Sequence, residues 1–169
     1  DADDERAEAS EEDETDDGWV LVTSGMSDRR MQLDAEALEG EAPPRAELVW
    51  YVREPTEEIL ENLRWLARFP FLEQTWLGMG HTIPMPQPIF EGSALTTFFF
   101  LPPIITMEQE LAENLRIGGD LVELYVVHLL TADEYALKKS GGTDAMLDLF
   151  DDNDYGFILD PERDSMVSS

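Results

Sequence analysis

The chain of 169 residues is 43% hydrophobic, carries a formal net charge of −27 from 38 acidic and 11 basic residues, and contains no cysteine. This length and apolar content fit one domain with a hydrophobic core, whereas the charge argues against direct nucleic-acid binding, because phosphate contacts need clustered Lys and Arg. The lack of cysteine excludes disulfides and thiolate chemistry, and no apolar run approaches the length of a membrane span.

Residues 1–17 are the most acidic segment, with eleven acids and one arginine. Their only apolar side chains are alanines, so burial cannot offset the entropy of ordering, and we predict a disordered, solubilising tail. The alternative is an arm that binds a partner or mimics nucleic acid.

We expect one folded domain over residues 18–169. The acidic balance favours a basic protein partner, and the lack of cysteine suits the cytoplasm.

Two strand patterns open the predicted domain. WVLVTS (19–24) and ELVWYV (47–52) are short, apolar and rich in residues that favour strands. Gly25 should end the first strand. The residues over 34–46 include a glycine, two prolines and many acids, which predicts an irregular connection between the strands.

A helix is expected to begin at Pro55, because proline is tolerated in the first helical turn. Its apolar side chains recur at helical spacing and form one stripe: Ile59, Leu60, Leu63, Leu66 and Ala67. Pro70 should end this helix, since proline interrupts the helical hydrogen bonds. One further helical turn is expected over 71–77, and the Gly- and Pro-rich residues 78–93 predict a long loop.

Two longer strands are predicted after this loop. ALTTFFFL (94–101) carries bulky residues on both faces, which favours a central position in a sheet. Gly118-Gly119-Asp120 predicts a hairpin turn. LVELYVVHLL (121–130) consists almost entirely of strand-forming residues and is the clearest strand pattern of the sequence.

The residues after 130 again show patterns that are typical of helix ends. Thr131 and Glu134 have the spacing of a capping box, which predicts a helix start. Gly141-Gly142 should end that helix, after which Thr143 can cap a second one. FIL (157–159) predicts a last short strand.

Strands and helices are mixed without strict alternation. This order predicts an α+β fold, with a mixed, mostly antiparallel sheet flanked by helices in a single domain. The apolar positions of the helical and strand patterns predict the core side chains: Leu63, Leu66, Phe98, Phe100, Leu124, Val126, Leu147 and Phe150.

The sequence contains no nucleophile motif, phosphate-binding loop or zinc-type spacing. Its two histidines, His81 and His128, could meet a carboxylate and bind a metal, but each has a structural interpretation. His128 lies in an apolar strand, which predicts a core or sheet-edge histidine with one hydrogen-bond partner. His81 follows two glycines in TWLGMGHTIP (75–84), which predicts a histidine that fixes a loop through backbone hydrogen bonds. We therefore expect no catalytic residue, metal or cofactor; the alternative is a hydrolase that uses His81 with a nearby carboxylate.

Four blocks of the sequence, taken in order, resemble bacterial suppressor of fused domain proteins. The blocks are VTSGMSD (22–28), LRWLARFP (63–70), TWLGMGHT (75–82), and a carboxyl-terminal set made of ELY (123–125), EY (134–135), DAMLDLF (144–150) and LDPER (159–163). They are similar to the family's T-x-G-[ML]-S-D turn, its L-A-R-Y-P helix end, its T-W-L-x-x-G-H-T segment and its closing strand, helices and L-D-x-x-R strand. The likeness extends over about residues 18–167, with a departure at LLT (129–131), where relatives often have a proline.

The resemblance implies a protein-binding domain rather than an enzyme. Bacterial members of the family are widely regarded as immunity proteins that bind and block polymorphic toxins, so it also implies a protein partner such as a basic toxin domain. The likeness is to the amino-terminal half of the animal regulator that binds zinc-finger transcription factors of Hedgehog signalling, and that ligand is not carried over. Within the matching blocks, the candidates for a partner interface or a structural loop are Asp28, Trp76, His81 and Ile83.

Overall fold

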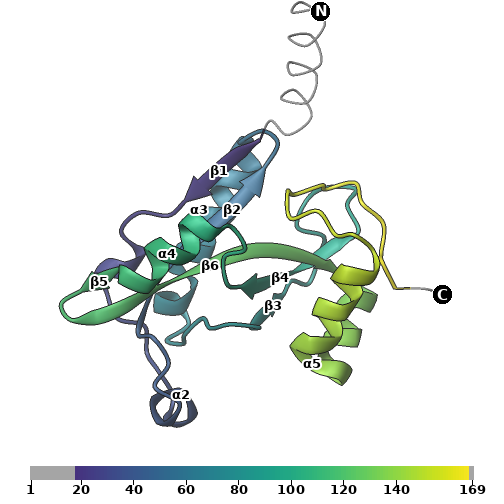
Figure 1. Ribbon diagram of the computed structural model, residues 1–169. Helices are drawn as coiled ribbons and strands as arrows, with labels where there is room; N and C mark the ends of the chain where they lie inside the picture. The colour runs from purple at the N-terminus through teal and green to yellow at the C-terminus, as the bar shows by residue number, and fades with distance from the viewer. Residues whose placement is uncertain (1–17, 168–169) are drawn as a thin grey trace, which may run out of the picture.

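The computed structural model describes residues 18–167, and the predicted acidic tail lies outside the described residues. One six-stranded sheet forms the centre of the fold (Figure 1). Its strands are β1 (Trp19–Val22), β2 (Arg45–Val52), β3 (Thr82–Pro84), β4 (Leu95–Leu101), β5 (Arg116–Ile117) and β6 (Asp120–Thr131). The helical elements are η1 (Met26–Asp28), α2 (Ala35–Glu39), α3 (Glu57–Leu72), α4 (Thr106–Asn114) and α5 (Ala132–Asp152).

The sheet is mixed and mostly antiparallel, as predicted. Its strand order is β1-β2-β6-β4-β3, and β5 pairs with β6 off this path. Only β2 and β6 run parallel; every other pair is antiparallel. The four longer strand patterns of the sequence correspond to β1, β2, β4 and β6, and β6 joins the two halves of the sheet because it pairs with both β2 and β4.

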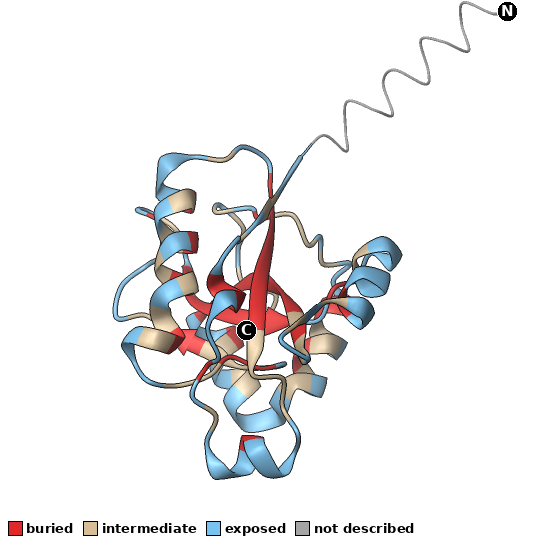
Figure 2. Cartoon of the chain, turned by 90° about the vertical axis from the view of Figure 1, so that its left-hand side faces the viewer, coloured by how far each residue is buried: buried red, intermediate tan, exposed pale blue. Residues whose placement is uncertain are grey.

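Each face of the sheet is covered by helices. One face packs under α3, where Trp50, Phe98 and Phe100 of the sheet share a buried cluster with Leu66 of the helix. On the other face, one cluster lies under α4 and another under α5. Figure 2 shows that buried residues follow the strands and the inward sides of the helices. This pattern arises because successive side chains of a strand point to opposite faces.

The predicted core side chains are buried, except for Leu147. Leu147 is half-buried against the cluster under α5, and its neighbour Met146 occupies the fully buried position instead. Among residues 18–167, no helix combines the length and apolar character needed to cross a membrane.

Both ends of α3 differ from the prediction that the helix begins at Pro55 and is ended by Pro70. Thr56, not Pro55, is its N-cap, because the Thr56 hydroxyl accepts a hydrogen bond from the Ile59 amide at 3.3 Å. Pro70 lies inside the helix, which continues to Leu72. Proline removes only one hydrogen bond in this last turn, and the Glu73 amide restores the pattern by bonding the Phe69 carbonyl at 3.0 Å.

Besides the one-turn helix η1, three elements lie where the sequence predicted none. The predicted connection over 34–46 contains α2, whose N-cap Asp34 accepts a hydrogen bond from the Ala37 amide at 2.8 Å. The predicted loop over 78–93 contains β3, which pairs with β4. The helix α4 follows Pro102-Pro103, in a segment without a clear helical stripe.

The capping box at the start of α5 is confirmed. The Glu134 carboxylate accepts a hydrogen bond from the Thr131 amide at 2.8 Å, and the Thr131 hydroxyl accepts one from the Glu134 amide at 3.4 Å. Gly142, with φ of 78°, divides α5 into two helical segments, which confirms the predicted break. The predicted strand over 157–159 is reduced to one parallel bridge between Val52 and Leu159.

Candidate functional site

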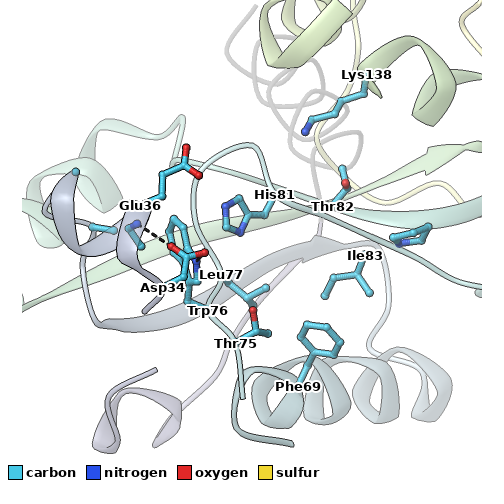
Figure 3. Close-up of a pocket in the computed structure, with 14 residues that line it drawn as sticks. Asp34, Glu36, Phe69, Thr75, Trp76, Leu77, His81, Thr82, Ile83 and Lys138 are labelled. Carbon is cyan, nitrogen blue, oxygen red and sulfur yellow. Dashed lines mark hydrogen bonds between the residues drawn. The ribbon is translucent and has the colours of Figure 1, made fainter. Parts of the chain in front are cut away.

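The segment from Thr75 to Pro84 lines a pocket with a volume of about 990 Å³. We call it the His81 pocket; its walls come from α2, from the end of α3, from the 75–84 segment and from α5. Figure 3 shows Trp76 and His81 next to Asp34, with Lys138 reaching in from α5. Its lining includes Asp34, Glu36, Phe69, Trp76, His81, Ile83 and Lys138.

Both glycines of this segment are required by close contacts. Gly80 has a φ of 79°, and its amide donates to the Phe100 carbonyl at 2.7 Å. A Cβ at Gly80 would overlap the Thr143 hydroxyl, and one at Gly78 would overlap the Trp76 indole. The turn therefore packs tightly on Thr143, next to the break in α5. Only a residue without a side chain fits at each of these two positions.

The His81 ring is held in this turn by the backbone. Its Nδ1 accepts a hydrogen bond from the Gly78 amide at 3.1 Å, so a neutral ring carries its proton on Nε2. The ring centroid lies 4.3 Å from that of the Trp76 indole, edge to face. Burial is the main cause that lowers the pKa of His81, and nearby Lys138 adds to it. The imidazole is consequently neutral near pH 7.

Trp76 connects His81 to α2. Its indole Nε1 donates to Asp34 Oδ2 at 3.3 Å, and the same carboxylate caps α2. These hydrogen bonds lower the pKa of Asp34, the bond from the Ala37 amide most of all. The exposed acids Asp34 and Glu36 thus flank a half-buried aromatic pair.

The structure brings together three of the four candidate residues. Trp76, His81 and Ile83 line one pocket, although Ile83 is buried in the main core and presents little surface. Asp28 lies apart from them, exposed at the end of η1. Whether any of these residues contacts a partner stays a prediction.

The pocket does not show the geometry of a general-base dyad. Within residues 18–167, no hydrogen bond or ion pair joins His81 to a carboxylate, since Nδ1 is bonded to Gly78 and Asp34 is bonded to Trp76 and α2. No group of three or more His, Asp or Glu side chains in the described part of the chain is placed to hold a metal.

Sequence reasoning missed the role of Glu47. This buried glutamate lies on β2 and accepts hydrogen bonds from the Gly25 amide at 3.0 Å and from the Ser27 amide and hydroxyl at 2.9 Å. The Thr23 hydroxyl also donates to it. Glu47 therefore shapes the turn of the VTSGMSD block, and a single acid at the start of an apolar strand was the only signal for it.

Sequence reasoning also missed the ion pair between Glu134 and Arg163. Two parallel hydrogen bonds of 2.7 and 2.8 Å join the guanidinium to the carboxylate, and Glu134 is fully buried. The Glu134 carboxylate also accepts from the Met166 amide at 2.9 Å, while Arg163 donates to the Leu129 carbonyl at 2.7 Å. Burial alone would raise the pKa of Glu134, but Arg163 and the backbone amides outweigh it and lower that pKa.

His128 is a core histidine with one hydrogen-bond partner, as predicted. Its ring lies on β6 among aromatic side chains, 5.8 Å from Phe150 between centroids, and its Nδ1 is 3.1 Å from the Tyr155 hydroxyl oxygen. Burial, helped by the positive charge of Arg163, lowers the pKa of His128 to about 4.

Acid should therefore destabilise the protein through His128. The stabilisation is complete above the unfolded-state pKa of 6.5 and is lost as the pH falls toward about 4. This shift corresponds to about 3 kcal/mol of unfolding free energy. Chemical denaturation at a series of pH values should show that His128→Gln, which stays neutral, loses most of this slope. The matched His81→Gln variant should keep most of this slope, and lose only the part that comes from the lowered pKa of the half-buried His81. Equal slopes in wild type and His128→Gln would contradict the prediction.

Comparison with known proteins places this arrangement in a family. The family model "Suppressor of fused protein (SUFU)" matches residues 7–164, a range that begins inside the acidic segment. No curated protein matches the chain.

Solved structures share the fold. A putative SUFU homolog from Neisseria gonorrhoeae is similar, with 21% identity, a TM-score of 0.67, and coverage of 91% of this chain and 73% of that chain. Drosophila Suppressor of Fused is similar at 16% identity and a TM-score of 0.60, covering 88% of this chain and 39% of that one. A chain of the Sufu–Fu complex matches at 16% identity and a TM-score of 0.58, covering 88% of this chain and 70% of that one. Because the family model spans most of its length, the chain belongs to the suppressor of fused protein (SUFU) family.

Proposed function

We propose that this chain is a non-enzymatic protein-binding domain that takes a basic partner at the His81 pocket. The observation that carries the proposal is the half-buried Trp76 indole, which packs on the loop-fixing His81 ring and lies beside the exposed acids Asp34 and Glu36. Aromatic side chains in such positions commonly contribute most of the binding energy at interfaces. The Sufu–Fu complex, in which a family member is bound to a protein, supports the same type of function.

The finer proposal is that the partner is a toxin domain and that the chain is its cytoplasmic immunity protein. A net charge of −27, of which residues 1–17 contribute −10 (one base minus eleven acids), favours rapid encounter with a basic protein. An immunity protein needs only to cover a surface of the toxin, which requires no catalytic group. This matches a pocket in which the His81 imidazole and the Asp34 carboxylate are bonded to the protein itself.

The test begins with capture of the partner from the native host and its identification. The captured protein is then produced in a heterologous host with and without this chain. We expect the partner alone to arrest growth and co-production of the chain to restore it. A partner that is harmless alone would refute the immunity role but leave protein binding, whereas a failure to capture any protein would refute both.

The interface is tested with charge reversals. Glu36→Lys should lower affinity for the partner about tenfold, because it places a positive charge beside the pocket. The matched control Glu61→Lys changes an exposed acid on α3 outside the pocket and should leave affinity near that of wild type. Equal losses in both variants would show that net charge alone drives binding.

His81→Ala separates loop structure from contact. The variant leaves the Gly78 amide without its acceptor, so we expect a loss of about 1–3 kcal/mol in unfolding free energy. Affinity for the partner should then fall only as far as the folded fraction falls. Thermal melting and calorimetric titration measure both quantities. Unchanged stability with sharply weaker binding would instead make His81 itself a contact residue.

A further inference from the structure

The outer edge of β1 is an open sheet edge with apolar side chains. β1 is the last strand of the order, and no strand within residues 18–167 pairs with its outer side. Its sequence WVLV has no charge or proline, and Trp19, Val20 and Val22 are 58%, 50% and 56% exposed. Natural proteins usually protect such edges with charges, prolines or bulges, so an unprotected one indicates a contact surface.

The register shows which backbone groups of β1 are free. The Thr23 amide donates to the Leu48 carbonyl at 2.9 Å, which makes Thr23 a hydrogen-bonded position facing β2. Hydrogen-bonded and non-hydrogen-bonded positions alternate in an antiparallel pair. Leu21 therefore also faces β2, whereas the amides and carbonyls of Val20 and Val22 point outward.

An exposed apolar flank of α4 lies on the same face of the sheet. The Tyr51 hydroxyl donates to Glu108 of α4, and Tyr51 is the cross-strand neighbour of Val20. Figure 1 shows α4 lying across the sheet, and its Ala112 shares a buried cluster with Val49 and Tyr51 of β2. Met107 and Leu111 flank Glu108 on α4 and are 77% and 55% exposed. We call Val20, Val22, Met107 and Leu111 the β1–α4 surface.

We propose that the β1–α4 surface binds an extended segment of a partner protein as an added strand, in which apolar and basic side chains alternate. The free backbone groups of Val20 and Val22 require an extended partner, because only a strand can satisfy them in series. The four side chains of the surface require apolar groups on one face of that strand. Acidic residues favour basic groups on the partner, since α4 has three acids and no base and residues 1–17, which precede β1 in the sequence, include eleven acids.

A second copy of the chain fits this edge poorly, because pairing would bring together two molecules that each carry a charge of −27. The surface is also separate from the His81 pocket. β1 and β3 lie at opposite ends of the strand order, and the pocket is lined by β3 and its preceding turn. The proposal therefore goes beyond the proposed function and does not depend on it.

The test uses the full chain and a short synthetic peptide of alternating valine and lysine. Amide hydrogen exchange is followed by NMR at Val20, Leu21 and Val22. We expect saturating peptide to slow exchange at Val20 and Val22 about tenfold or more and to change Leu21 much less, because Leu21 is already bonded to β2. The matched peptide of alternating valine and glutamate should not bind.

Two variants test the edge directly. Val20→Pro removes an outward amide while leaving the Leu21 bond to β2, and it should abolish peptide binding. Val22→Lys keeps the backbone and should weaken binding of the lysine peptide at least about tenfold, with a melting temperature close to that of wild type. The control Leu72→Lys changes an exposed apolar residue at the end of α3 and should leave binding unchanged.

Two results would overturn the proposal. Peptide binding without slower exchange at Val20 and Val22 would mean that the peptide only neutralises acidic side chains. Exchange at these amides that slows as the concentration of the free chain rises would mean that a second copy occupies the edge.

Discussion

Arg163→Met is expected to lower the unfolding free energy by about 3–5 kcal/mol, since it leaves a fully buried carboxylate without its cation. The Arg163 guanidinium is the only basic group that bonds Glu134 among the described residues, and it also donates to the Leu129 carbonyl. The variant therefore removes the hydrogen bonds by which the Arg163 side chain joins the carboxyl-terminal segment to β6 and α5. Denaturation in urea at neutral pH measures the effect.

The chain contains a matched control for this variant. Arg64 and Glu57 form an ion pair on the surface of α3, with side chains 60% and 72% exposed. Arg64→Met should change stability by less than about 1 kcal/mol, because exposed pairs gain little over their hydrated state. Similar losses of unfolding free energy in Arg163→Met and Arg64→Met would show that the burial of Glu134 does not strengthen its ion pair.

Phe98→Ala is expected to cost about 3–5 kcal/mol by leaving a cavity in the centre of the sheet. Phe98 is fully buried, and its ring lies 6.4 Å from Trp50 and 6.1 Å from Trp65 between centroids. Both indoles would lose packing, and neither can move far because β2 and α3 fix their backbones.

Phe71→Ala is the control for this deletion. Phe71 is a half-buried ring near the end of α3 with the Arg29 guanidinium 4.2 Å above it. Its loss should cost clearly less than that of Phe98, since it leaves little enclosed space. A cost below about 2 kcal/mol for Phe98→Ala would mean that the core collapses onto the vacated site.

The parts of the fold that sequence predicted correctly are those with local signals. β6 has an uninterrupted run of strand-forming residues, and the capping box of α5 needs only Thr131 and Glu134 three positions apart. The glycine pair at 141–142 likewise indicates the break in α5 without knowledge of any distant contact.

The elements that sequence missed depend on distant contacts. β3 has three residues and exists because it pairs with β4, and α4 has a weak apolar stripe whose main buried residue is Ala112. Pro70 is tolerated because it falls in the last turn of a helix that tertiary packing stabilises. None of these causes can be read from a short window of sequence.

The candidate site follows the same rule. The 75–84 segment was recognisable because its glycines and histidine are contiguous. The role of Glu47 was not, because its donors lie some twenty positions earlier in the chain. The pairing of Glu134 with Arg163 could not be predicted either, because each of the two residues has many other charged residues closer to it in the sequence.

The central position of β6 determines when the sheet can form during synthesis. Arg45 pairs with Val122, so β2 has no neighbour on that side until the ribosome has released the hairpin near Gly119. Until then β2 and β4 each expose an apolar edge to other nascent chains. Proteins dominated by such long-range pairings fold slowly and are exposed to aggregation. Newly made copies of this chain are therefore expected to be most prone to aggregation in the interval before β6 has been synthesised.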